Sequence, residues 1–274
     1  MVSMKRTFAA SAILVFTTSI LLADFSYQET TKVTGGMLMH AGGVAPKPQT
    51  SAIYVKGNRL ARIGPEHGQI TDLDKETIVN VDYTRKTYSI MTFAQMKAMM
   101  AQVSGAKDEA GGVNISSHET GKTRVIGNVT AKETIMTVKV GESQIDSDVW
   151  LAPMVSGYDE VRQFQQRMAQ KMGGAGAAGI QRSMQEAAKA LTKANGVPVL
   201  QTSSIRGGAP AGAPGGDKPM IETSTEMGGF SAASVDASKF DVPAGFQKTE
   251  MGMRGQRPQP AHGAQSPQSR PAHQ

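Results

Sequence analysis

The chain has 274 residues, a formal net charge of +6 and no cysteine. The lack of cysteine excludes disulfides, thiolate nucleophiles, cysteine zinc sites and lipid attachment through an N-terminal cysteine. The positive charge does not indicate a nucleic-acid-binding surface, because Lys5 and Arg6 contribute +2 and residues 247–274 contribute +3. Only +1 remains for residues 24–246, so we expect no nucleic-acid partner.

The first 23 residues have the layout of a secretory signal peptide. Lys5 and Arg6 precede an apolar run from Phe8 to Leu22, and Ala23 offers a small residue for cleavage. The apolar run is shorter than the ~20 residues that a membrane-spanning helix needs. We therefore expect cleavage near residue 23, a periplasmic or secreted location, and no integral membrane segment after cleavage.

Residues 24–246 predict a single domain that consists mainly of β-strands. β-branched and aromatic residues, which favour strands, concentrate in the segments that follow. We expect a strand over 24–34, hairpins over 51–64 and 76–92, two strands over 122–141 with a turn near 130–132, and strands over 147–153, 197–205 and 220–235.

Two loop-like segments flank or interrupt this domain. The Gly/Pro-rich stretch 206–219 is predicted to be a flexible loop between two neighbouring antiparallel strands, since a long loop costs little closure entropy. Residues 247–274 are rich in Gly, Pro, Gln, Ser and His and offer almost nothing to bury, so we expect them to form a disordered tail.

Helical spacing of apolar residues appears in three places. Thr92 and Gln95 fit a capping box at the start of a helix over 92–103. A second stripe runs from Tyr158 to Met168, and a third from Ile180 to Leu191 ends at an Asn-Gly pair. These stripes predict short amphipathic helices that pack against the sheet.

The sequence Gly121-Lys122-Thr123 is the ending of a nucleotide-binding P-loop, but the rest of that motif is missing. Ser116 stands where the motif needs its first glycine, and the residues after Thr123 form a β-run rather than a helix. We interpret residues 120–122 as a hairpin turn in which Gly121 has positive φ. No nucleotide partner is expected.

Other chemical patterns are weak. Met37, Met39 and His40 lie together in a glycine-rich stretch, and thioether and imidazole groups suit Cu(I). A single Met-x-Met-His pattern makes copper handling the least favoured of the binding hypotheses, and we expect no cofactor. No nucleophile, base and orienting residue assemble from the sequence, so an enzyme is not expected.

Six short motifs follow one another along the chain: YVKGNRLARI (54–63), TIVNVDYTRKTYSIMTFAQMKAMM (77–100), TGKTRVIGNVTAKE (120–133), DVWLAP (148–153), GVPVL (196–200) and FDVPAGFQK (240–248). In this order they resemble a family of uncharacterised exported bacterial proteins known only as a domain of unknown function. That family is similar in outline to the LolA/LppX-type lipoprotein carriers. The resemblance implies an α+β, mainly β fold: a curled antiparallel sheet forming an incomplete barrel, with a few helices against its concave face.

In the carrier fold the apolar hollow holds acyl chains, so the resemblance favours a non-catalytic carrier of a lipid-like ligand. Its partners would be lipids or the acyl chains of lipoproteins. The alternative is an interaction domain that binds another envelope protein and no small ligand. Strand and helix residues that would line the hollow are Ile78, Tyr88, Ile90, Met96, Met100, Met136, Val138, Trp150, Phe164 and Met168. The same residues suit an ordinary packed core, so both interpretations stay open.

Overall fold

The computed structural model describes residues 24–40, 46–104, 114–140, 143–172, 196–207 and 218–250. The expected signal peptide and the predicted helix over 180–191 lie outside these residues. The helices are α1 (Met37–His40), α2 (Phe93–Ser104), α3 (Asp159–Met172) and the 3₁₀ turn η1 (Ala237–Phe240). The strands are β1 (Phe25–Gly35), β2 (Gln49–Lys56), β3 (Arg59–Ile63), β4 (His67–Asp72), β5 (Thr77–Asp82), β6 (Thr87–Thr92), β7 (Asn114–Ile126), β8 (Val129–Val140), β9 (Ser143–Ala152), β10 (Val197–Arg206), β11 (Ile221–Ser231) and β12 (Gln247–Lys248).

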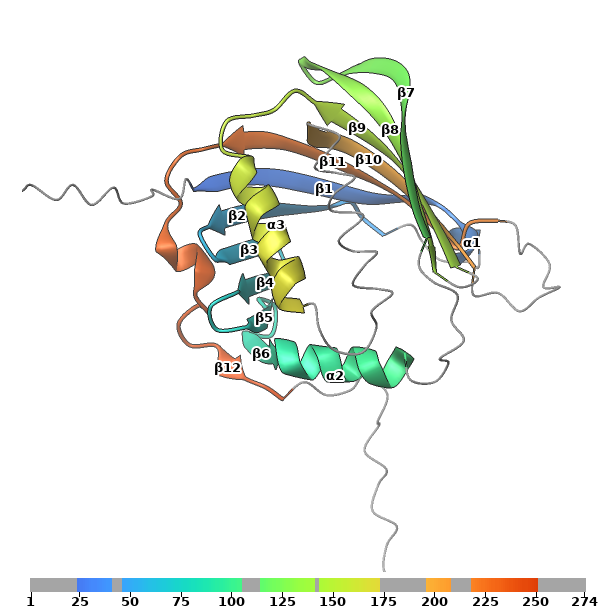
Figure 1. Cartoon of the computed structure of the whole chain (residues 1–274). Coiled ribbons are helices and arrows are strands. Elements are labelled where there is room, and N and C mark those ends of the chain that lie inside the picture. The colour runs from blue at the N-terminus through green and yellow to red at the C-terminus, as the bar shows by residue number, and fades with distance from the viewer. Residues whose placement is uncertain are drawn as a thin grey trace, which may run out of the picture.

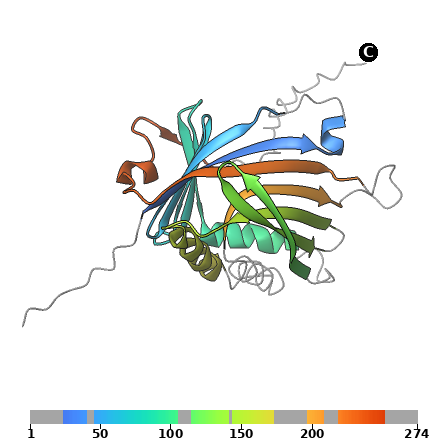
Figure 2. The ribbon, with the colours of Figure 1, turned by 90° about the horizontal axis from the view of Figure 1, so that it is seen from above.

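All of these strands belong to one sheet of twelve, in the order β12-β6-β5-β4-β3-β2-β1-β11-β10-β9-β8-β7. Neighbours are antiparallel except for the short parallel pair of β12 and β6. The sheet curls strongly without closing, and α3 lies inside the curve while α2 runs beside β6 (Figure 1). Seen from above, α2 and α3 lie on the same side of the sheet (Figure 2). The predicted fold class, a mainly β, curled antiparallel sheet with helices on its concave face, is confirmed.

Local sequence signals explain the smaller half of the sheet. The hairpins predicted over 51–64 and 76–92 are β2–β3 and β5–β6. Their turns contain Gly57 and Lys86, both with positive φ. Strand β4 was not predicted, because Ile70 and Thr71 are its two β-branched residues and they stand next to each other among Gly, Gln and Asp. It forms because it pairs with β3 on one side and β5 on the other, so tertiary pairing outweighs its weak propensity.

Helix α2 begins as its sequence predicts. The Thr92 hydroxyl accepts a hydrogen bond of 3.1 Å from the Gln95 N–H, and the Gln95 side-chain oxygen accepts one of 2.8 Å from the Thr92 N–H. This reciprocal pair is a capping box, which satisfies two backbone donors that the first helical turn leaves free.

The β7–β8 hairpin differs from the prediction. Its turn lies at Gly127 and Asn128 rather than near 130–132, since Ile126 pairs with Val129. Residues 120–122 do not form a hairpin turn either. They form an irregularity inside β7, where the register shifts between Glu119 and Thr123 and Gly121 has φ +77°. Gly127, with φ +61°, suits the first central position of a two-residue turn. The turn therefore begins three to five residues before the predicted turn at 130–132.

The two larger apolar clusters of the described residues lie on opposite faces of the sheet. The concave core contains eleven buried residues from β1, β2, β5, β10, α2, α3 and their flanks: Phe25, Tyr27, Ile53, Val55, Leu73, Ile78, Phe93, Tyr158, Val161, Phe164 and Val197. The convex core is smaller and joins β3, β4 and β5 to the segment around η1: Ala61, Ile70, Val81, Val235 and Phe240. Figure 1 shows the η1 segment outside the curve, away from α3.

The predicted loop over 206–219 and the predicted tail over 247–274 compare differently with the structure. Segment 206–219 does join neighbouring antiparallel strands, and the Met220 N–H donates to the Ile205 carbonyl at 2.7 Å where β11 begins. The predicted tail begins too early, because Gln247 and Lys248 pair with β6 and the Thr249 N–H donates to the Tyr88 carbonyl at 2.8 Å. Pairing of β12 with β6 uses backbone groups and needs no apolar side chains, so the polar composition of this segment did not indicate it. Residues 251–274 lie outside the described part.

None of the helices in the described part of the chain combines the length and apolar character that a membrane crossing requires.

Candidate functional site: a cavity under helix α3

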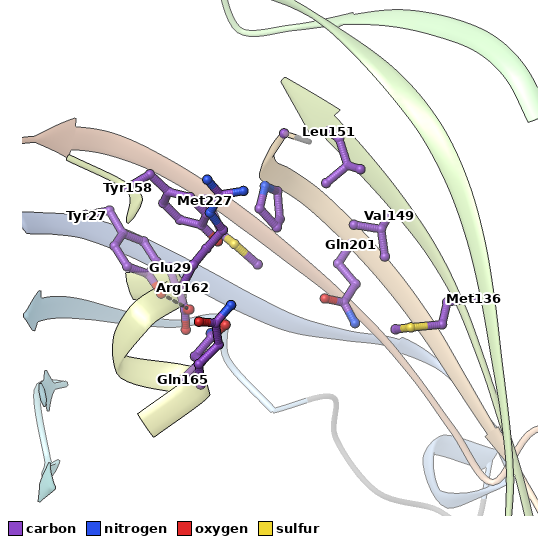
Figure 3. Close-up of a pocket in the computed structure, with 13 residues that line it drawn as sticks. Tyr27, Glu29, Met136, Val149, Leu151, Tyr158, Arg162, Gln165, Gln201 and Met227 are labelled. Atoms are coloured by element: carbon purple, nitrogen blue, oxygen red, sulfur yellow. Dashed lines mark hydrogen bonds between the residues drawn. The ribbon is translucent and has the colours of Figure 1, made fainter. Parts of the chain in front are cut away.

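A cavity of about 250 Å³ lies between α3 and the concave face of β1, β8, β9, β10 and β11 (Figure 3). Residues from all of these elements line it: Tyr27, Glu29, Met136, Val149, Leu151, Tyr158, Arg162, Gln165, Gln166, Gly196, Pro198, Gln201 and Met227. Strand pairing explains how distant residues meet there. Glu29 lies opposite Met227 across β1 and β11, and Gln201 lies opposite Val149 across β10 and β9.

One side of the cavity is apolar. Val149 and Leu151 are two residues apart on β9 and therefore share a face, and both are buried. Met136 of β8 and Met227 of β11 add two thioether side chains that lie toward the cavity in Figure 3. Methionine side chains are flexible and polarizable, so they adapt to apolar groups of varied shape.

The opposite side carries a buried carboxylate with two partners. Glu29 is 8% exposed, accepts a hydrogen bond of 3.1 Å from the Tyr27 hydroxyl and forms an ion pair with Arg62 of β3. Burial, together with the Glu29 charge, raises the pKa of Tyr27. The phenol therefore stays protonated and remains a donor to the carboxylate, which satisfies a charge that would be costly to bury alone.

A cation and a second phenol stand beside this carboxylate. Arg162 of α3 lines the cavity and donates from Nε to the Asp159 carboxylate at 3.0 Å. Tyr158, one turn earlier, is buried, and burial raises its pKa to about 12, so its hydroxyl is also a donor at neutral pH. The cavity is thus amphipathic: aliphatic and thioether groups face a side with one carboxylate, one guanidinium and two phenols.

Helix α3 places these groups through its own sequence pattern. Gly157 has φ +87°, which turns the chain from β9 into the helix, and its carbonyl accepts the Glu160 N–H. Val161 and Phe164 are buried in the concave core, with Met168 packed against it. Arg162 lies beside this apolar stripe. Because the stripe packs against the concave core, the Arg162 side chain is placed at the cavity.

The residues predicted to line a hollow do not all gather in one place. Among those whose side chains the structure describes, only Met136 lines the cavity. Ile78 and Phe164 belong to the concave core, and Met96 and Met168 pack against it. Val138 lies two residues beyond Met136 on the same face of β8, half-buried, outside the cavity lining.

Three further predicted residues lie on the convex face. Tyr88 pairs with Val81 and packs against the convex core. Ile90 is two residues along β6 and therefore points to the same side. Trp150 alternates with Val149 and Leu151, so it faces away from the cavity, and the Arg124 guanidinium lies 5.9 Å from its ring centre. The prediction named residues on apolar strands without assigning their faces, which is why it mixed the two sides.

The remaining predicted residues are Met100 and the copper candidates Met37, Met39 and His40. The side chains of Met100 and His40 lie outside the described residues. Met37 and Met39 are half-buried in the short helix α1, where the Met37 N–H donates to the Pro219 carbonyl at 2.9 Å. In the described part of the chain no group of three or more His, Asp or Glu side chains is arranged to hold a metal ion.

Sequence reasoning missed the polar side of the cavity. Tyr27 and Glu29 are two residues apart on β1, and the placement of a carboxylate on the apolar face of an otherwise alternating strand was a usable signal. Gln201 and Arg162 carry no such signal, since both are ordinary surface residue types that become cavity residues through strand pairing and helix packing.

No protein-family model matches this chain, and a comparison with curated proteins finds no match.

Proposed function

We propose that the protein is an exported, non-catalytic binding or carrier protein for an amphipathic, lipid-like ligand, and that the ligand binds in the cavity under α3. The observation that carries this proposal is the division of the cavity into an apolar side and a polar side. The apolar wall of Met136, Val149, Leu151 and Met227 suits hydrocarbon. The Arg162 and Tyr158 donors suit an oxygen-rich head group.

The unclosed sheet supports the same function. A ligand that must be taken up and released needs a site that opens, and α3 is a single helix laid across the concave face rather than a strand of the sheet (Figure 1). The charges at the polar side are already partnered, Glu29 by Arg62 and Arg162 by Asp159. Neither Glu29 nor Arg162 is therefore left as an unpaired charge at the cavity wall. The signal-peptide pattern at the N-terminus supports export to the periplasm or beyond.

Displacement of a fluorescent fatty acid by lysophospholipids tests this function, and native mass spectrometry of protein purified from its own cells identifies the bound molecule. Met136→Trp places an indole in the cavity and should weaken binding by about tenfold or more. Met99→Trp is the matched control, because Met99 is 45% exposed on α2. Equal binding by both variants, or no binding by the wild type at micromolar concentration, contradicts the proposal.

A second candidate function is the binding of an envelope protein at the edge of the sheet. In the described part of the chain β7 pairs only with β8, and Val125 on this edge strand is 67% exposed. Exposed edges accept an extended partner segment by backbone pairing. The irregularity at Gly121 and the charge of Lys122 make this edge a poorer template, so we rank it second.

A photo-crosslinking residue at Val125 tests this second function in cells. A single crosslinked envelope protein that disappears when Thr123, two residues away on the same edge strand, is replaced by proline supports it. Crosslinks indistinguishable from those of a residue on the convex face, such as Asp148, contradict it.

A further inference from the structure

Five aliphatic side chains form one row across five neighbouring strands. Strand pairing places Ile115 opposite Val138, Val138 opposite Ile145, Ile145 opposite Ile205, and Ile205 opposite Ile221. We call these five residues the aliphatic row. With neighbouring strands ~4.8 Å apart, the row is about 19 Å wide.

The aliphatic row is not part of the protein's core. None of its members belongs to, or packs against, the apolar clusters of the described residues. Ile205 is 37% exposed and the other four are half-buried. Contiguous exposed apolar surface is uncommon on monomeric proteins and marks a binding site more often than isolated apolar residues do.

The row continues the apolar side of the cavity. Val138 follows Met136 by two residues on β8, and Ile145 precedes Val149 by four on β9, with unbroken register between these strands. Side chains an even number apart share a face, so the row and the cavity lie on the same concave surface, about 7 Å apart along β8. In Figure 3, Met136 marks the end of the cavity from which the strands continue.

Among the described residues, the surface between the cavity and the row is uncharged. The intervening positions opposite Met136 are Ser147, Ser203 and Thr223. The hydroxyls of Ser147 and Ser203 lie 2.9 Å apart and hydrogen-bond to each other. The ion pair of Arg206 with Asp146 lies on the other face of the same strands, since both residues alternate with members of the row.

This surface suits hydrocarbon better than peptide. A peptide laid on the face of a sheet brings backbone N–H and C=O groups that need partners, and burying them unpaired is costly. The face offers carbon atoms and a few hydroxyls, two of which are already paired. A hydrocarbon chain requires no hydrogen bonds and gains free energy for each methylene that it buries.

The size of the cavity also indicates that a long ligand would extend beyond it toward the aliphatic row. Its volume of about 250 Å³ lies below the ~300–1,000 Å³ typical of small-molecule sites. A long-chain lipid seated there must extend beyond it, and the uncharged surface toward the row is an apolar way out.

We propose that the aliphatic row is the second half of the ligand site and binds the distal part of a long hydrocarbon chain whose head group and first carbons occupy the cavity. This inference rests on the proposed function and narrows it to long-chain lipids. It also orients the ligand, with the head group toward Arg162 and the chain end toward Ile145 and Ile205.

A chain-length series tests the row. Lysophosphatidylcholines from octanoyl to palmitoyl are titrated by displacement of a fluorescent fatty acid, each below its micelle concentration. For the wild type, affinity should rise about two- to fourfold for each added methylene through to palmitoyl. Ile205→Asp and the milder Ile205→Thr should bind octanoyl and decanoyl lipids like the wild type but gain little from longer chains.

Val125→Asp is the matched control, since Val125 is an exposed aliphatic residue at the opposite end of the β7–β8 pair. It should keep the wild-type chain-length dependence. If both Ile205 variants retain that dependence, or lose thermal stability without any change in it, the row is covered by protein and the inference is wrong. If the wild type binds short chains with no gain beyond decanoyl, the inference fails while the proposed function stands. If no probe of any length binds, the proposed function itself fails.

Discussion

Tyr27 donates a hydrogen bond of 3.1 Å to Glu29, two residues further along β1, and both residues are 8% exposed at the polar side of the cavity. A strand that otherwise presents apolar residues to the concave core thus ends its buried face with a carboxylate. The same carboxylate is paired with Arg62 from β3. Phe25 thus lies in the packed core, Glu29 lines the cavity, and Tyr27 between them belongs to both.

The ion pair should respond asymmetrically to mutation. The Glu29 side chain is 10% exposed and that of Arg62 is 47% exposed. Arg62→Met leaves a buried carboxylate without its cation and should lower the free energy of unfolding by about 2 kcal/mol, less than the ~3–5 of a fully buried pair because Arg62 is half solvated. Glu29→Gln leaves a cation that water can solvate and should cost about 1 kcal/mol or less.

Urea denaturation of the two single variants and of the double variant measures this difference. The double variant should be more stable than Arg62→Met alone, since no charge is then left buried. Equal losses in both single variants would show that the pair behaves as an ordinary surface ion pair.

Truncating a side chain to alanine should cost more unfolding free energy in the concave core than at the cavity wall. Phe164 is 1% exposed in the concave core, so Phe164→Ala should cost ~3–5 kcal/mol of unfolding free energy. Met136 is half-buried at the cavity, and Met136→Ala should cost less than about 2 kcal/mol because few packing contacts are lost. Chemical denaturation checks both values. A Met136→Ala loss as large as that of Phe164→Ala would identify Met136 as core.

Asp24 should make the free energy of unfolding depend on pH in the acidic range. Burial acts to raise the pKa of Asp24, but hydrogen bonds from Lys56 Nζ and the Val235 N–H, each 2.7 Å, outweigh it and hold the pKa below its usual 3.8. Because the Asp24 pKa is lower in the folded state than in the unfolded state, the Asp24 charge stabilises the fold at pH values above the unfolded-state pKa. This stabilisation is lost as the pH falls through the folded-state pKa.

Asp24→Asn removes the titrating group. Its unfolding free energy should therefore fall below that of the wild type near neutral pH, and the gap should narrow as the pH drops from about 4 toward 2. Denaturation curves across that range measure the gap. A constant difference at every pH would mean that the Asp24 charge does not contribute.

Two glycines with similar backbone angles should differ in their tolerance of alanine. Gly157 has φ +87°, and an added Cβ would lie 2.9 Å from Phe25 Cδ2. Gly121 has φ +77°, and its added Cβ would meet nothing within 4 Å. Gly121→Ala should cost ~1–2 kcal/mol from the backbone angle alone. Gly157→Ala should cost a further ~1–3 kcal/mol from overpacking.

Thermal unfolding of the two glycine variants, with circular dichroism to verify strand content, makes the comparison. If Gly121→Ala proves the more damaging change, the irregularity in β7 is under greater constraint than its open surroundings indicate.

Export should leave a protein that begins near Asp24. The basic residues Lys5 and Arg6 precede an apolar run with Ala23 at its end, the pattern that signal peptidases process. Intact-mass measurement of protein recovered from the periplasm or medium determines the start. Recovery of a full-length, membrane-bound form would contradict both the cleavage and the proposed location.

Features that depend on neighbouring residues could be predicted from the sequence. The hairpin turns near Gly57 and Lys86 and the Thr92–Gln95 capping box follow from short-range backbone requirements. Short-range signals were weaker where glycine is frequent. Gly121 and Gly127 both have positive φ, yet one lies in a strand irregularity and the other in the hairpin turn. Which of them ends the strand depends on how β7 pairs with β8.

Alternation and helical spacing are local periodicities, so a mainly antiparallel β-fold with a few amphipathic helices could be predicted from the residues alone. Which face each strand buries, and which distant strands pair, became known from the folded sheet. Tyr88 and Ile78 both looked like lining residues, yet they face opposite sides of the sheet. The cavity joins Glu29 of β1 to Met227 of β11, residues far apart in the chain that a one-residue slip in register would separate. Pairing between distant strands is a property of the whole sheet, so the site it creates is not present in any one segment.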